Sequence, residues 1–305
     1  MREAKYRQLI ALFVGLLPAF PLAAQTPAAT DARPQLQALA LVEAALSSTD
    51  ANAGEWKKLA AAYDTLAAEN AKNAAVFAAR GHFGWERGEH ARAVADWQTA
   101  LRLEPTRADA LIGLGGAAIA AGETVQAAAL HRQAVAAQPL DSAAHFALAN
   151  VLFLFRHELR DATHPDEASV LQEALARFAD ATRLAPRSAE YARAFAETFY
   201  VVPGPDWERA RDAWEKVRDL SPTKDFALVN LARVQLKMRH FDASRLCLDQ
   251  VQNPAFQRIK SRLEAQLPPR PVIPTTPAPV LPSGGPADLG ENSSHPVIDD
   301  PRLAP

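Results

Sequence analysis

Small residues and prolines recur every 34 residues through the middle of the sequence, and this period constrains the fold more than any other feature. The first set is Gly81, Ala93, Ala100 and Pro105. The second set is Gly115, Ala127, Ala134 and Pro139, each 34 residues later. A period of this length indicates a repeat protein, in which each unit buries its apolar face against the next unit.

The period is interrupted once and then resumes. The third set is Ala149, Ala174, Ala181 and Pro186. Ala149 keeps the 34-residue shift, whereas the other three lie 47 residues after their counterparts, so 13 residues are inserted between them. The fourth set is Ala196, Ala210, Val217 and Pro222, and the fifth is Ala232, Ser244 and Val251. The chain therefore predicts five units, with an insertion near 155–168 in the third.

Each unit divides into two helical halves. The first two units are split by Gly88-Glu89 and by Gly122-Glu123, again 34 residues apart. Each terminal proline follows a helical pattern, where a helix must stop because proline cannot continue it. We expect two helices of about 12 to 15 residues per unit, with the small residues where the helices cross closely.

These units resemble the tetratricopeptide repeat over roughly residues 74–253. The stretch Ala91–Pro105, ARAVADWQTALRLEP, matches the second helix of that family well, whereas the first helices match less well. The resemblance implies an all-α fold, an α-solenoid of stacked antiparallel helix pairs that forms a right-handed superhelix with a concave face. It also implies that the protein binds other proteins.

The flanking segments extend the repeats at both ends. Residues 34–73 carry two further helical patterns, with apolar stripes at Leu36, Leu39, Ala40, Val42 and Leu46, and at Trp56, Leu59, Tyr63 and Leu66. We interpret them as a degenerate first repeat. At the other end, Asn253-Pro254 predicts a helix start. A helix over 254–267, with Phe256, Ile259, Leu263 and Leu267 on one face, would close the core of the stack.

The two ends of the chain have different compositions. Arg2, Lys5 and Arg7 precede an apolar run over 9–17, and Ala23-Ala24 follow. This order predicts a signal peptide over 1–24 and a linker over 25–33, with an uncleaved membrane anchor as the alternative. Residues 268–305 are rich in proline and have no apolar period, so we expect a disordered tail. The tail serves either as a spacer or as a ligand for an aromatic groove.

The overall charge and the cysteine content exclude several classes of function. The formal net charge is -2, with an isoelectric point near 6.5, so no nucleic-acid partner is indicated. Cys247 is the single cysteine, so no intrachain disulfide can form, and its helical setting favours a buried apolar role. We expect an exported protein, periplasmic or extracellular, without stable membrane insertion after signal removal.

The resemblance also implies which residues line the concave groove. In the family, the first helix of each unit faces this groove. The expected lining residues are Trp85, Ile112, Ile119, Phe146, Asn150, Phe153, Arg193, Glu197 and Tyr200. Asn150 stands where the family often places an Asn that bonds the backbone of a bound peptide. Alternatively, Phe146 and Phe153 pack against the insertion and leave no open groove.

Catalytic and metal-binding patterns compete with this interpretation. The insertion contains His157, Glu158, Asp161, His164, Asp166 and Glu167, which are residue types that bind metals. Their spacing matches no known site, and the sequence contains no Ser-His-acid order or Gly-rich phosphate loop. We therefore predict a non-catalytic scaffold of the bacterial cell envelope that needs no cofactor and binds a peptide or protein segment. The alternative is an envelope enzyme or metal-binding protein with its site at the insertion.

Overall fold

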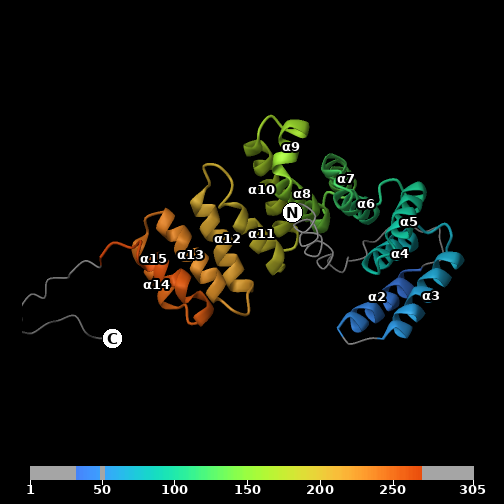
Figure 1. Cartoon of the computed structure of the whole chain (residues 1–305), viewed down its shortest axis with the longest axis horizontal. Helices are drawn as coiled ribbons and strands as arrows, with labels where there is room; N and C mark the ends of the chain where they lie inside the picture. The colour runs from blue at the N-terminus through green and yellow to red at the C-terminus, as the bar shows by residue number, and fades with distance from the viewer. Residues whose placement is uncertain (1–31, 49–51, 270–305) are drawn as a thin grey trace, which may run out of the picture. The chain divides into compact units, whose positions relative to one another are not determined.

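The computed structural model describes residues 32–48 and 52–269 as an all-α helical repeat (Figure 1). The described residues contain no strand, and one compact unit extends to Leu267. The predicted signal peptide over 1–24, most of the linker over 25–33, and residues 270–305 of the predicted tail lie outside the described residues.

The helices follow one another along the chain with short connections. Their bounds are α2 Arg33–Ser47, α3 Ala53–Glu69, α4 Ala74–Glu86, α5 His90–Leu103, α6 Ala108–Ala120, α7 Thr124–Ala137, α8 Ser142–Leu154, α9 Arg156–Thr163, α10 Glu167–Leu184, α11 Ala189–Thr198, α12 Trp207–Leu220, α13 Asp225–Lys237, α14 Phe241–Asp249, and α15 Gln257–Glu264, which is preceded by a 3₁₀ turn at Pro254–Phe256.

Five helix pairs make up the repeat units. Units one to five are α4/α5, α6/α7, α8/α10, α11/α12 and α13/α14, and the two helices of each pair pack on each other. The first helices of neighbouring units also touch, as α4 does with α6 and α6 with α8. The short helix α9 lies between the two helices of unit three, and its buried Leu159 joins the core there.

A residue in the left-handed backbone region lies between the two helices of units one, two, four and five, at Gly88, Gly122, Gly204 and Arg239. Gly88 and Gly122 have φ values of 81° and 80°, and the next residue donates its N–H back to Gly84 and Ala118, each over 2.8 Å. These bonds satisfy carbonyls at the helix end, and only glycine adopts such a φ without steric cost. In unit five the same position is held by Arg239, with φ 63°.

The small residues of the repeat lie against a buried ring, as the close crossing predicted. A Cβ built on Gly81 would stand 2.6 Å from the Trp97 Nε1, and one built on Gly115 would stand 2.7 Å from the His131 ring. The two pairs have the same spacing along the chain and are related by the repeat period. The equivalent rings of units three and four are Phe178 and Trp214, and all four rings are buried. We call this the ring position.

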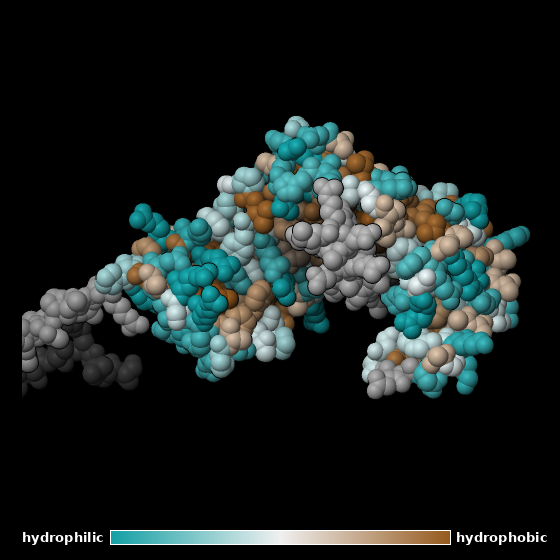
Figure 2. Space-filling model, in the orientation of Figure 1, coloured by the Kyte–Doolittle hydropathy of each residue, from teal (hydrophilic) through white to brown (hydrophobic). Residues whose placement is uncertain are grey.

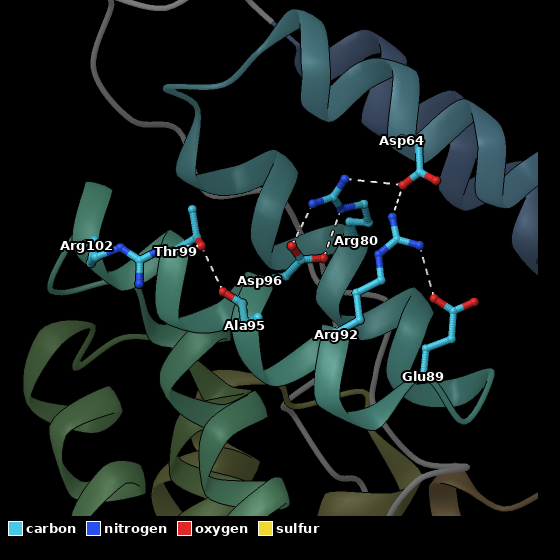
Figure 3. Close-up of polar contacts among 8 residues, drawn as sticks. All are labelled: Asp64, Arg80, Glu89, Arg92, Ala95, Asp96, Thr99 and Arg102. Carbon is cyan, nitrogen blue, oxygen red and sulfur yellow. Dashed lines mark hydrogen bonds and ion pairs between the residues drawn. The ribbon is translucent and has the colours of Figure 1, made fainter.

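A charged network fastens α3 to unit one (Figure 3). Arg80 on α4 donates two hydrogen bonds to the buried carboxylate of Asp96 on α5, at 2.7 and 2.9 Å, and a third to Asp64 on α3 at 3.2 Å. Arg92 also reaches Asp64 and pairs with Glu89. One guanidinium therefore joins three helices through charge-assisted bonds.

At the N-terminal end, the apolar stripe of α3 packs inward and that of α2 does so only in part. Leu36 is buried against α3, but Ala40 and Val42 are exposed, so the predicted inclusion of these two in the stripe is wrong. Among the described helices, α2 packs mainly on α3, so only a narrow apolar stripe is buried.

The C-terminal end closes with a short helix. The Asn253 side chain caps the start by accepting from the N–H of Ala255. Leu263 is buried against α13, while Ile259 remains 36% exposed, so its predicted packing is wrong. The outer surface in this part of the chain is largely hydrophilic (Figure 2). A polar outer face is what the end of an open stack requires.

Candidate functional site

The predicted groove residues all stand on or next to the first helices of the units. Trp85 is on α4, Ile112 and Ile119 are on α6, Phe146, Asn150 and Phe153 are on α8, Arg193 and Glu197 are on α11, and Tyr200 follows α11. We call the surface that these helices contribute the first-helix face.

Three of the predicted residues are buried in the core. Trp85 packs on Trp97, with 5.6 Å between ring centroids. Ile112 and Ile119 belong to clusters that contain residues of α8. Because the first helices of neighbouring units pack directly on each other, side chains at their contact line fill the space between units. These three therefore stabilise the stack and offer no accessible surface for a ligand.

The two phenylalanines of α8 are half-buried, and Phe146 lies at the junction between units three and four. The Phe146 ring stacks on Tyr191 of α11 at 4.3 Å and meets Phe178 of α10 edge-on at 5.7 Å. The Phe153 ring meets Phe178 at 6.3 Å and lies 5.8 Å from the guanidinium of Arg156. Phe153 thus contacts the first residue of α9, whereas the ring contacts of Phe146 are with the repeat helices.

Asn150 lies between these rings on the same helix. Its side chain is half-buried and, within the part of the chain that the structure describes, makes no hydrogen bond. Residues spaced by three or four positions share a helix face, so Phe146, Asn150 and Phe153 form one strip. The strip offers a free amide with one acceptor and two donor hydrogens, flanked by apolar rings.

The predicted residues on and just after α11 contact residues of α13. Arg193 donates to Glu197 over 2.8 Å, and its guanidinium lies 4.7 Å from the ring centre of Phe226. The Tyr200 hydroxyl donates to the backbone carbonyl of Asn230 over 3.1 Å.

Arg233 of α13 also contacts Tyr200 and Asn230. It lies 5.3 Å from the Tyr200 ring centre and donates to the Asn230 side-chain oxygen over 3.2 Å. Arg193 and Arg233 therefore each lie over an aromatic ring contributed by the neighbouring unit, and Glu197 pairs with Arg193. Sequence reasoning missed Phe226 and Asn230. The available signal was their position on the same face of α13 as Arg233.

Burial controls the ionisation of the aromatic hydroxyls here. Burial raises the pKa of Tyr200 strongly, the Glu197 charge raises it further, and Arg233 lowers it in part. Burial also raises the pKa of Tyr191 to about 12. Both hydroxyls therefore stay protonated near neutral pH, and Tyr200 remains a hydrogen-bond donor.

The two histidines of the insertion contact two different carboxylates of α10. His164 lies 2.9 Å from Glu173, which also accepts from Arg132 over 2.8 Å. His157 lies 3.0 Å from a different carboxylate, that of Glu167. Among the described residues, no three His, Cys, Asp or Glu side chains gather as a metal site would require. His157 and His164 thus contact carboxylates of α10, and Glu173 connects α10 to Arg132 of α7.

The single cysteine lies far along the chain from these groups. Cys247 on α14 is half-buried among apolar side chains of units four and five, and burial raises the pKa of its thiol. A thiol with a raised pKa carries little thiolate near neutral pH and is a poor nucleophile.

Solved structures of other proteins share this architecture. YrrB, solved as a TPR protein with an unusual peptide-binding site, aligns with a TM-score of 0.53 at 17% identity, over 68% of this chain and 99% of its own. PilF of Pseudomonas aeruginosa aligns with a TM-score of 0.54 at 15% identity, over 77% of this chain and 100% of its own. The chain has the tetratricopeptide-repeat fold.

A third solved structure shares the same fold. PilW, described as a widely conserved type IV pilus biogenesis factor, aligns with a TM-score of 0.51 at 12% identity, over 76% of this chain and 99% of its own. No protein-family model matches the sequence, and no curated protein matches it. In the described part of the chain, none of the helices combines the length and the apolar character needed to cross a bilayer.

Proposed function

We propose that this protein is an exported, non-catalytic scaffold of the bacterial cell envelope that binds a peptide or protein segment on its first-helix face. The observation that carries the proposal is the strip on α8, where the free amide of Asn150 lies between the rings of Phe146 and Phe153. A side-chain amide can pair with a peptide group of an extended ligand, while the two rings receive its apolar side chains.

The face of α11 and α13 extends this site toward a charged ligand. Arg193 is exposed and forms an ion pair with Glu197, whereas Arg233 has no carboxylate partner among the described residues. The face therefore carries two guanidinium groups and one carboxylate, which favours an acidic segment. Charge reversal by Arg193→Glu should slow association and weaken its dependence on salt.

Export is supported by the N-terminal sequence and by one structural neighbour. The pattern over 1–24 is that of a signal peptide, and PilW is named as a pilus biogenesis factor. Intact-mass measurement of the protein recovered from the envelope fraction should give a chain that begins near Gln25. Recovery of the whole chain with membranes would contradict export by cleavage.

Binding is tested with residues 25–305 immobilised against an envelope extract, followed by titration with the recovered partner. Asn150→Ala should weaken binding about five-fold, because a net hydrogen bond contributes about 1 kcal/mol. Gln172→Ala is the matched control, since this exposed side chain lies on α10, the second helix of the same unit. Equal affinity of both variants and the parent protein would show that the strip on α8 is not the site.

A further inference from the structure

The ring position of unit two is occupied by His131, whereas units one, three and four carry Trp97, Phe178 and Trp214 there. In unit one the Trp97 ring lies against Gly81 of α4 and Gly113 of α6, so this ring joins two units. By the same register, His131 lies against Gly115 of α6, and the α8 position equivalent to Gly113 is Ala147. His131 therefore stands where the stack needs an apolar wedge between units two and three.

The surroundings of His131 suit only a neutral ring. Its exposed fraction is 1%, and neither ring nitrogen has a hydrogen-bond partner within the described chain. One turn before and after it on α7 stand the fully buried Ala127, Ala128 and Ala134. Burial alone lowers the pKa of His131 to about 4.

No charged group is placed to stabilise a protonated ring within the described helices. On α6 the titratable residue is Asp109, which accepts from Arg107, and on α7 it is Arg132, which pairs with Glu173. On α8 it is His145, which bonds to the Pro139 carbonyl and lies 3.5 Å from Asp180. The charged residues of α9 are exposed, apart from Arg156, which pairs with Glu167.

We propose that unit two is an acid-sensitive joint, in which a proton taken up by His131 separates α7 from α6 and α8 while units four and five stay folded. An imidazolium without partners in an apolar space is strongly disfavoured, so in mild acid the proton enters when the helices part and water reaches the ring. Units four and five have no buried histidine, because the single histidine in residues 189–249 is His240, and it is exposed.

The direction of the pH dependence follows from the two states. In the open form His131 has its ordinary pKa of 6.5, and in the packed form it has a pKa of about 4. The neutral ring therefore contributes stability that is complete above pH 6.5 and is lost as the pH falls toward 4. These values give an opening constant that is about 30-fold larger at pH 5 than at pH 7.5.

Acid would also act on the proposed binding strip, because α8 carries Asn150 and Phe153. That consequence rests on the proposed function. Proton uptake itself does not, since it is measured on the free protein.

Hydrogen exchange of the full-length chain tests the joint. The parent protein and His131→Phe are compared at the same pH, so the chemical exchange rate cancels. The measured quantity is the exchange rate of each amide in the parent divided by its rate in His131→Phe. For amides of α6 to α8 this ratio should be about 30-fold larger at pH 5 than at pH 7.5. Amides of α11 to α14 should keep the same ratio at both pH values. The matched control is His157→Gln on α9, which should behave as the parent does.

Two results would overturn the proposal. One is a ratio for α6 to α8 that does not change with pH, and the other is acid acceleration spread equally over all units. His131→Gln provides the same comparison if the Phe variant does not fold, because it also removes the proton site. Ring resonances of His131 in the folded protein should remain those of the neutral imidazole at pH 5. Titration of that ring near pH 6.5 without helix opening would equally contradict the joint.

Discussion

The sharpest test of the repeat register uses two glycines of one helix. Gly113 and Gly116 both lie in α6, within one turn of each other, so the same substitution should change helix propensity equally at both. A Cβ built on Gly113 would stand 2.6 Å from the Trp97 Cδ2, whereas a Cβ built on Gly116 meets nothing within 4 Å. Alanine in place of helical glycine stabilises by about 0.5 to 1 kcal/mol when there is room.

The two substitutions should therefore change stability in opposite directions. At Gly113 the methyl group would overlap a ring that is held between two helix backbones, and such overpacking costs about 1 to 3 kcal/mol. After the gain in propensity is subtracted, Gly113→Ala should destabilise by about 0.5 to 2 kcal/mol. Gly116→Ala should stabilise by about 0.5 to 1 kcal/mol.

Thermal melts followed by circular dichroism give the result. For a folded unit of this size, 1 kcal/mol corresponds to roughly 2 to 4 °C. Gly113→Ala should lower the melting temperature by about 1 to 8 °C, and Gly116→Ala should raise it by about 1 to 4 °C. In a Trp97→Leu background, Gly113→Ala should no longer destabilise, because the ring is absent. Equal shifts for the two glycines in the parent protein would refute the placement of the Trp97 ring against α6.

Three further predictions concern other parts of the stack. Asp96→Asn should lower stability by roughly 1.5 to 3 kcal/mol in urea unfolding, because it removes a buried carboxylate from Arg80, whereas Glu89→Gln at the exposed edge of the same network should cost less than about 0.5 kcal/mol. Arg239→Gly should raise the melting temperature. A non-glycine residue in the left-handed region costs about 1 to 2 kcal/mol, which exceeds the extra chain entropy that glycine loses on folding. A lowered melting temperature would contradict this turn geometry. Deletion of 268–305 should leave the melting temperature unchanged, whereas further deletion through α15 should expose the apolar face of unit five and cause aggregation in light scattering; equal behaviour of the two truncations would refute the boundary.

The repeat architecture could be predicted from the sequence because its determinants are local and periodic. A glycine with positive φ is needed wherever a helix turns back sharply, and Gly88 and Gly122 mark two such turns at equivalent positions of successive units. A small residue is needed wherever a ring crosses a helix closely, and Gly81 and Gly115 mark two of those crossings. Each requirement involves one short segment, so each left a readable signal in the chain.

The candidate site could be predicted only to the level of the helix that carries each residue. The period places Ile119 and Phe153 at equivalent positions of α6 and α8, yet Ile119 is buried against α8 and Phe153 is half-buried. Ile119 belongs to the buried cluster shared with α8, whereas Phe153 only packs on the edge of that cluster and beside Arg156 of α9. Such packing depends on residues from several helices, and the repeat period does not contain that information.

The chemical state of particular side chains depends on packing between helices. In the sequence, His131 is one of eight histidines and has no distinguishing motif. Its lack of hydrogen-bond partners comes from the close approach of α6 and from the alanines of α7, which exclude water from both ring nitrogens. Likewise, Arg193 and Phe226 belong to different units and meet because α11 and α13 stack.

The start, turn and recurrence of each helix are set by neighbours along the chain, so they can be read from the order of residues. Whether a side chain is dry, paired or free is set by residues that are distant in sequence, because burial requires several helices to meet around it.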